Sequence, residues 1–312
     1  MLRTSANALS LIATGLPAPV RGALWMCAAA AAFALMINLV RYLTTGLDPL
    51  EVVFLRSAFG LLAMLPWLAR RGLSVLRTQR IGLHILRATI GIVAMVGWFT
   101  VLSLMPLAEA TALSFTAPIF SSILAVVLLG EVMRVRRWSA IGIGFLGALI
   151  ILRPGVEALE PVALLAIGTA AVWASSTVLI KLMTRTESAG AITTYLVLFT
   201  APLSLIPALF VWQTPSLEQL GFAVLLGAAG TTGHLCMTRA LAAAEATVVI
   251  PFDYLRLPLV ALIAYLAFGE VPDIWVWIGG GVIAASSVYI AHRESRLKPK
   301  EVPVAAAPEP RA

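Results

Sequence analysis

The sequence predicts an all-α integral membrane protein with ten transmembrane helices, arranged as two inverted repeats of five helices each. Of its 312 residues, 60% are hydrophobic and only 12% are charged, and the mean hydropathy is +0.97. A typical soluble domain is about half apolar and about one quarter charged. Because so few charges cannot cover a water-soluble fold of this length, lipid must cover most of the surface.

Ten apolar runs have the length that a membrane span requires. A helix needs about 20 apolar residues to cross a hydrocarbon core about 30 Å thick. The shortest run begins at residue 138 and extends back to Val135. In chain order the runs cover residues 22–40, 49–68, 88–108, 110–130, 138–152, 161–180, 189–212, 219–238, 246–268 and 274–291.

The distribution of basic residues predicts the orientation. The net charge of +7 is carried by short connectors and not by one amphipathic face, which argues against a nucleic-acid partner. With the N-terminus in the cytoplasm, all but four of the 22 Lys and Arg residues, Arg87 included, fall on the cytoplasmic side. The four are Arg41, Arg56, Arg153 and Arg256, at outer ends or within spans. This positive-inside bias places both termini in the cytoplasm and favours an even number of spans.

The chain divides into two repeats with a segment at each end. Residues 1–21 are expected to form a cytoplasmic N-terminal segment, although the weak apolar stretch after Arg3 leaves a signal peptide as an alternative. Residues 22–154 form the first repeat and residues 160–292 the second. Residues 293–312 are expected to be a disordered cytoplasmic tail.

A repeated signature supports this division. In each half a Glu-Ala-Thr triplet opens a span, a proline lies within it, and Gly-Glu ends it, about 136 to 140 residues apart. Five spans per half is an odd number, so the second half must be inverted. Inverted repeats let many secondary transporters open one central site to either side, and a duplication without transport is the alternative. The matching residues are Glu109-Ala110-Thr111, Pro118 and Gly130-Glu131, and Glu245-Ala246-Thr247, Pro258 and Gly269-Glu270.

These motifs carry a family resemblance. Together with Arg137–Pro154, Arg239–Leu241, Pro251–Tyr254 and Phe268–Asp273 they resemble the EamA-type branch of the drug/metabolite transporter superfamily over residues 22–292. The resemblance implies a ten-helix carrier whose central cavity opens to either side in turn. Within the branch, the run His84–Arg87, Trp98 and the Pro-Phe-Asp-Tyr run are most similar to bacterial S-adenosylmethionine carriers. Riboflavin and amino-acid carriers share much of the same skeleton.

Asp253 and Arg256 are the first candidates for a binding site. At 1.5 Å per residue they lie about 12 and 16 Å along a helix from Glu245, close to the membrane midplane, and their i, i+3 spacing puts them on one face. A charge at that depth is costly and should face a cavity or a partner. Arg256 could bind a substrate carboxylate, and Asp253 an ammonium, a sulfonium or a coupling proton. The alternative is a self-neutralised pair that only tightens packing.

Four aromatic residues are further candidates. Tyr254 flanks the pair, and Trp98, Phe115 and Trp173 lie within spans. Each could line the cavity and stack on a planar or cationic substrate. Each could equally pack in the core.

Three polar residues within spans complete the set of nine, and Arg56 is a weaker case. Ser114 and Asn38 could donate hydrogen bonds to substrate or to a neighbouring helix. His234 could relay protons or be a packing residue. Arg56, about 7–8 Å along its helix from Glu51, is expected to extend to the outer interface.

The sequence therefore predicts a secondary transporter of the cytoplasmic membrane that moves a small polar or zwitterionic metabolite, amino-acid-like or S-adenosylmethionine-like, by alternating access. A proton or ion gradient or counter-substrate exchange would drive it, and the chain would act as a monomer or homodimer. Carriage of riboflavin, another vitamin or a drug is the alternative, and a non-transporting assembly or sensor subunit, a channel and a membrane enzyme are rivals of other classes. No cofactor, catalytic constellation or metal site is expected, since Cys27 and Cys236 lie in apolar runs and the three His have no second ligand nearby.

Overall fold

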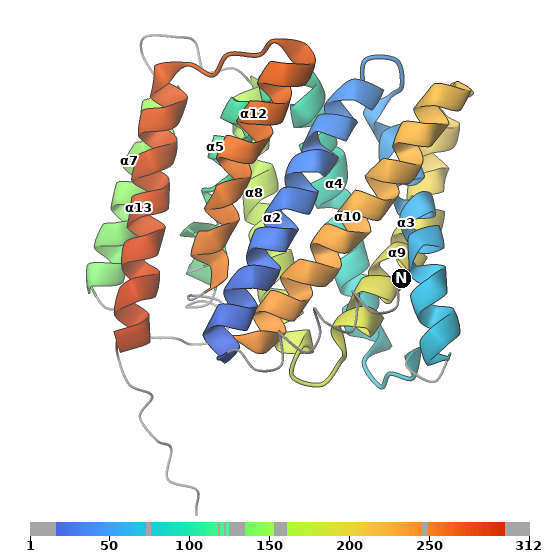
Figure 1. Cartoon of the computed structure of the whole chain (residues 1–312), viewed down its shortest axis with the longest axis horizontal. Coiled ribbons are helices and arrows are strands. Elements are labelled where there is room, and N and C mark those ends of the chain that lie inside the picture. The colour runs from blue at the N-terminus through green and yellow to red at the C-terminus, as the bar shows by residue number, and fades with distance from the viewer. Residues whose placement is uncertain are drawn as a thin grey trace, which may run out of the picture.

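The computed structural model describes residues 17–72, 76–117, 119–121, 123–124, 135–152, 161–244 and 249–296. Within these ranges every regular element is a helix, and Figure 1 shows the helices standing side by side in one bundle. They are α2 (Ala18–Leu43), α3 (Pro49–Arg71), α4 (Ile81–Leu104), α5 (Leu107–Ser114), α7 (Val135–Leu152), α8 (Pro161–Met183), α9 (Ala189–Leu209), α10 (Leu217–Ala243), the 3₁₀ helix η2 (Ile250–Leu255), α12 (Arg256–Phe268) and α13 (Ile274–Arg296).

Six of the described helices, α2, α3, α4, α8, α9 and α10, are long and apolar enough to cross a membrane. Large apolar side chains cover much of the outer surface of the bundle. A helix that faced water would carry polar and charged residues on that side. Leu62, Leu164, Ile206 and Leu266 are all more than half exposed. The fold is therefore that of a multi-pass membrane protein, as the composition predicted.

Polar caps mark where several helices begin. The Asp48 carboxylate accepts a hydrogen bond from Leu50 N at the start of α3, and the Ser188 hydroxyl accepts one from Ala191 N at the start of α9. Ser216 and Gln219 form a reciprocal capping box at the start of α10. Such caps satisfy backbone N–H groups that the first helical turn leaves without partners.

The helices pack in pairs. α2 packs against α10 and α4 against α8, while α3 packs against α9 and α7 against α13. Figure 1 shows α7 and α13 together at one edge of the bundle, with α2 and α10 crossing its middle. At the α2–α10 contact, a Cβ added at Gly233 would lie 2.7 Å from the Phe33 ring. Glycine at this position therefore permits the close helix approach that is common in membrane proteins.

Two of the predicted spans are interrupted. α5 ends at Ser114, and a turn at Phe115 and Thr116 precedes further helical residues. In the second half, η2 precedes α12, so the backbone changes from 3₁₀ to α geometry at Arg256. Proline explains this second change, because Pro258 lacks an N–H and its ring clashes with the carbonyl four residues earlier. Pro118, which would act in the same way, lies outside the described residues.

The predicted start of the third span is wrong. α4 begins at Ile81, seven residues before the predicted start, so Arg87 is buried inside the helix and not in a cytoplasmic connector. Other expectations cannot be compared with the structure. Gly130-Glu131, Glu245-Ala246-Thr247, most of the N-terminal segment and the end of the tail lie outside the described residues.

Candidate functional site

A cavity lies where the two interrupted spans meet α2, α3, α4, α8 and α10. Its empty volume is about 1090 Å³, including the part that is open at its mouth, and its wall is mostly apolar. Ligand pockets are commonly concave, largely apolar and carry a few polar groups. Eight of the nine predicted site residues line it: Trp98, Ser114, Phe115, Trp173, His234, Asp253, Tyr254 and Arg256.

Asp253 and Arg256 form an ion pair at one side of this cavity. Their Oδ2 and Nη2 atoms are 3.0 Å apart, and 26% and 12% of the two side chains are exposed. The prediction placed the pair on one helical face by α-helix geometry, whereas Asp253 belongs to the 3₁₀ helix η2. In a 3₁₀ helix the side chains at i and i+3 eclipse each other, so the change in geometry preserves the pairing.

Arg256 also reaches across to the first half of the chain. Its Nη2 donates a 3.4 Å hydrogen bond to the Ser114 hydroxyl, and its Cζ lies 5.4 Å from the centre of the Phe115 ring. Phe115 in turn meets Tyr254 edge-on, with ring centres 4.6 Å apart. The two interrupted spans are thus joined at their breaks by a cation, a hydroxyl and two aromatic rings.

A second aromatic group lies on the α2, α8 and α10 side of the cavity. His234 contacts the rings of Phe33 and Trp173, with centre-to-centre distances of 5.3 and 5.5 Å, and Phe33 meets Trp173 edge-on. His234 is buried, and its Nδ1 has no hydrogen-bond partner among the described residues. The histidine therefore packs between rings and also presents a polar nitrogen to the interior.

Asn38 is the predicted site residue that the structure does not bring to the cavity wall. It is 4% exposed, and its Nδ2 donates to the Ala34 carbonyl at 2.9 Å on the same helix. Asn38 therefore bonds its own helix, whereas the sequence predicted a bond to substrate or to a neighbouring helix.

Arg56 is the residue whose place the sequence interpretation missed. It was expected to extend to the outer interface, but it is 0% exposed and contributes to the cavity wall. Its Nε, Nη1 and Nη2 have no hydrogen-bond partner among the described residues. A depth argument along one helix could not show which face points inward. Room for its side chain comes from Gly230, 174 positions later, where an added Cβ would lie 2.7 Å from Nε.

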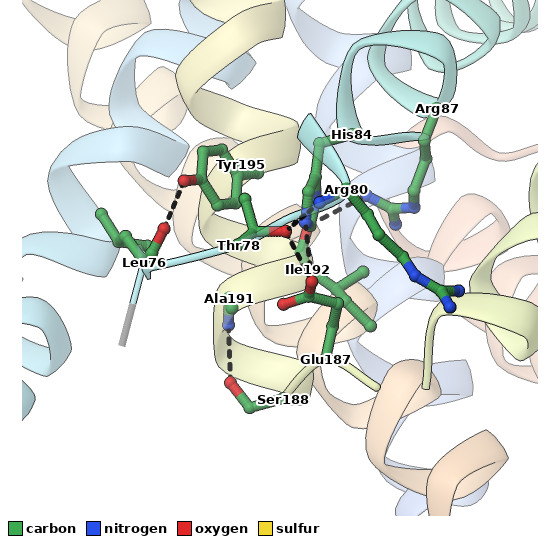
Figure 2. A network of polar contacts seen from close by, with 10 residues as sticks. All are labelled: Leu76, Thr78, Arg80, His84, Arg87, Glu187, Ser188, Ala191, Ile192 and Tyr195. Atoms are coloured by element: carbon green, nitrogen blue, oxygen red, sulfur yellow. Dashed lines mark hydrogen bonds and ion pairs between the residues drawn. The ribbon is translucent and has the colours of Figure 1, made fainter. Parts of the chain in front are cut away.

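A polar network lies at the start of α4 and α9 (Figure 2). Arg87 donates to the Ile192 carbonyl at 3.2 Å, as Figure 2 shows. Glu187 accepts a 2.6 Å bond from the Thr78 hydroxyl, and His84 Nε2 lies 4.0 Å from the same carboxylate. Arg87, His234 and Trp173 together line a second, smaller cavity, whose empty volume is about 210 Å³ including the part that is open.

Two basic residues bind helix ends at opposite ends of the bundle. Arg41 donates to the carbonyls of Leu102 and Ser103 where α4 ends. Lys181 donates to the carbonyls of Leu241 and Ala244 where α10 ends. Arg41 lies near the end of α2, whereas the start of α2 lies against the end of α10. A Cβ added at Gly22 would contact both Ala240 and Ala244. The two sites are therefore separated by roughly the distance along α2 from Gly22 to Arg41, about 28 Å.

The described residues contain no group of three or more His, Cys, Asp or Glu side chains that could hold a metal ion. Cys27 and Cys236 are free thiols. The cavity wall offers charged groups, hydrogen-bonding groups and aromatic rings.

Comparisons with known proteins agree with this architecture. A riboflavin transporter of Vibrio cholerae serotype O1 is 34% identical over 289 residues, which cover 91% of this chain and 97% of that protein. An S-adenosylmethionine uptake transporter of Rickettsia bellii is 32% identical over 262 residues, which cover 84% and 90%. A solved crystal structure that is 20% identical shares the fold, with a TM-score of 0.64 over 88% of this chain and 98% of that one.

The model of one family matches nearly the whole length of the chain, in two segments that correspond to its two halves. The matches cover residues 20–153 and 161–291. This chain belongs to the EamA-like transporter family.

Proposed function

We propose that this transporter moves a small polar metabolite across the cytoplasmic membrane by alternating access, and that the substrate binds in the cavity at the Asp253–Arg256 pair. The observation that carries the proposal is the meeting of two interrupted spans at that pair. In many secondary transporters, discontinuous helices near the bilayer midplane form the substrate site. Tyr254, Phe115, Trp98 and Trp173 would enclose the substrate.

The packing supports ten spans in two inverted repeats. Suppose that α2–α7 form one repeat and α8–α13 the other, so that α2 corresponds to α8 and α4 corresponds to α10. The contact of α2 with α10 then has its symmetric counterpart in the contact of α8 with α4, and both contacts are present. Helices that correspond to each other also pack together: α3 contacts α9, and α7 contacts α13. This is the pattern that a two-fold axis between the repeats requires.

Arg41 and Lys181 support the same symmetry at residue level. Each lies three residues before a threonine whose hydroxyl donates back to its carbonyl, Thr44 or Thr184. Each binds the carbonyls at the end of a helix that would be the third of its repeat. The two contacts lie at opposite ends of the bundle, as inversion demands. With the positive-inside bias, we propose that Arg41 faces outward and that both termini are cytoplasmic.

The cavity favours a planar, polar substrate. Arg256 and Asp253 offer one donor and one acceptor of opposite charge, so they can exchange their mutual pairing for a zwitterionic or hydrogen-bonding group. The aromatic side chains suit a flat ring system. The names of the relatives cover both a flavin and an adenosyl sulfonium compound, and both contain such rings. We propose a substrate of this general class, with riboflavin-like and S-adenosylmethionine-like compounds as the two candidates.

Energy for transport would come from a proton or ion gradient, or from exchange against a counter-substrate. Asp253 is the proposed proton site, because its carboxylate faces the cavity and is paired with one arginine. The cavity is formed within a single chain, which supports a single-chain transport unit in a monomer or homodimer.

The purified protein in liposomes tests the proposal. Vesicles preloaded with unlabelled riboflavin, S-adenosylmethionine or an amino acid should accumulate the matching labelled compound by counterflow for at least one of these substrates. Net uptake into vesicles without internal substrate distinguishes the driving forces. Net uptake above the external concentration that requires a proton gradient identifies proton coupling, equilibration without a gradient identifies facilitated diffusion, and uptake only against internal substrate identifies exchange. Absence of counterflow for every compound of this class would contradict the proposed function and favour a non-transporting subunit.

A further inference from the structure

Arg56 and Arg87 are the two largest fully buried side chains of the described part of the chain. Arg56 lies on α3 and contributes to the wall of the main cavity, and Arg87 lies on α4 and lines the smaller one. His234 on α10 lines both cavities, so it shares one cavity wall with Arg56 and the other with Arg87. A second cationic region thus faces the interior, built from helices other than those that carry Asp253 and Arg256.

The charges of this region are not neutralised by the described residues. Arg56 makes no hydrogen bond there, and Arg87 makes a single one, to the Ile192 carbonyl. No ion pair of either arginine with a carboxylate is found among the described residues. Glu51, five residues before Arg56, accepts from Gln213 N through Oε2, and Glu187 accepts from Thr78. A guanidinium stays protonated in proteins, so both charges persist.

Two buried guanidinium groups with so few hydrogen bonds are energetically costly unless a bound group supplies the missing acceptors. A buried charge without a partner is strongly unfavourable, and native structures pair nearly all buried polar groups. Within membranes, ionisable side chains mark substrate or ion pathways. The chain also makes room for the cation, because Gly230 leaves space at the Arg56 guanidinium, where a Cβ would lie 2.7 Å from Nε and 3.1 Å from Nη2. His234 follows one turn later on the same face of α10.

We propose that Arg56 and His234, with Arg87 behind them, form a second binding pole of the cavity, which takes a hydrogen-bond acceptor group of the substrate such as a carboxylate or the carbonyl edge of a heterocycle. The inference deepens the proposed function and rests on it. One end of the substrate meets Asp253 and Arg256, and its acceptor end meets Arg56. Arg56 and Arg256 against Asp253 leave the wall of the main cavity with a net positive charge, and Arg87 on the smaller cavity adds to it. The cavity therefore selects neutral or anionic substrates over net cations.

Two matched probes isolate that charge preference. S-adenosylhomocysteine and S-adenosylmethionine differ by one methyl group on sulfur, and only the second carries a sulfonium. Riboflavin is a neutral probe with a dicarbonyl edge. Equilibrium binding to the purified full-length protein should be tighter for S-adenosylhomocysteine than for S-adenosylmethionine. Tighter binding of the sulfonium compound would overturn the proposed selectivity.

Variants of Arg56 test the pole itself. Loss of a charge-assisted hydrogen bond should weaken binding of the best neutral probe about tenfold to a hundredfold in Arg56→Leu, and Arg56→Lys should restore part of that loss. The melting temperature of the ligand-free Arg56→Leu protein should be unchanged or higher, because a buried unpaired cation has been removed. Arg239→Leu is the matched control, since Arg239 lies over the Trp25 ring outside the cavity wall, and it should bind the probe as wild type does.

The outcomes separate this inference from the function on which it rests. If wild type binds and transports a probe but Arg56→Leu binds it equally well, the second pole is wrong and the proposed function stands. A lower melting temperature in Arg56→Leu with unchanged affinity also rejects the second pole and assigns Arg56 a structural role. If wild type neither binds nor transports any compound of the class, the proposed function fails and this inference fails with it.

Discussion

The guanidinium of Arg41 lies 3.1 Å from the carboxylate of Glu270, which joins the last turn of α2 to the residues that follow α12. The same carboxylate accepts a 2.9 Å hydrogen bond from Leu107 N at the start of α5. Arg41 also donates to Leu102 and Ser103 at the end of α4. One ion pair therefore ties together the ends of four helices, at the end of the bundle that the proposed topology faces outward.

Breaking the Arg41–Glu270 ion pair should shift the protein toward a conformation in which the cavity is open to the outside. Glu270→Gln keeps the shape of the side chain and removes its charge. A partly exposed pair contributes about 0.5–1 kcal/mol, which corresponds to an outward-open population about two to five times larger. The measurement is labelling of Ala117→Cys, on the cavity wall, by an impermeant maleimide in a background that lacks Cys27 and Cys236.

Glu218→Gln provides the control for that labelling experiment. Glu218 accepts a hydrogen bond from the Tyr42 hydroxyl, also near the end of α2, and does not contact Arg41. Its loss should leave the labelling rate close to that of the parent. Equal rates in the two variants would show that the Arg41–Glu270 pair does not hold this end closed.

Gly230→Ala should disturb the Arg56 guanidinium. The new Cβ would lie 2.7 Å from Nε, so the arginine or the helix must move, at a cost of about 1–3 kcal/mol in the free energy of unfolding. Gly221→Ala on the same helix has no atom within 4 Å of its Cβ and should stabilise by about 0.5–1 kcal/mol. Denaturation of both variants in one detergent measures the difference. Equal stabilities would mean that the Arg56 side chain is not confined as the structure describes.

Phe115→Leu should weaken the binding of planar substrates. It removes the ring that contacts both Arg256 and Tyr254 but leaves an apolar side chain. Aromatic and cation–π contacts of this kind contribute about 0.5–1.5 kcal/mol, so affinity should fall about two- to tenfold. Phe54→Leu is the matched control, because Phe54 meets Trp212 outside the cavity wall. A similar loss in both variants would point to general loosening of the fold.

Asn38→Leu should leave substrate affinity unchanged. Asn38 does not line the cavity, and its buried Oδ1 has no hydrogen-bond partner among the described residues. Replacing an incompletely bonded amide with an apolar group of similar size is expected to be close to neutral for stability. Ser114→Ala, which loses the hydrogen bond to Arg256, should weaken binding in the same assay. A clear loss of affinity in Asn38→Leu would restore this residue to the site.

Hydropathy and charge were sufficient to predict membrane residence and most helix positions, because both depend on local sequence. They misplaced the start of α4, since a run defined by its lack of charges must begin after Arg87 even where the helix buries that arginine. Hydropathy also could not indicate the change to 3₁₀ geometry at η2. That feature depends on prolines and on packing against α2 and α13.

The contact between Asp253 and Arg256 could be predicted because spacing along one segment decides it. Asp253 and Arg256 are three residues apart, and an i, i+3 pair meets in α and 3₁₀ helices alike. The position of Arg56 depends on Gly230, and that of Asn38 depends on the rotation of α2 within the bundle. Both are set by tertiary packing between distant segments, which the pattern of one sequence does not specify.

The most direct test of the account is counterflow through liposomes by proteins that lack one member of the Asp253–Arg256 pair. For the substrate that wild type carries, Arg256→Gln and Asp253→Asn should lower the initial rate at least about tenfold, since each removes a charge-assisted contact. Arg239→Gln should retain the wild-type rate. If both cavity variants fold normally and transport at the wild-type rate, the substrate does not bind at this pair and the account is contradicted.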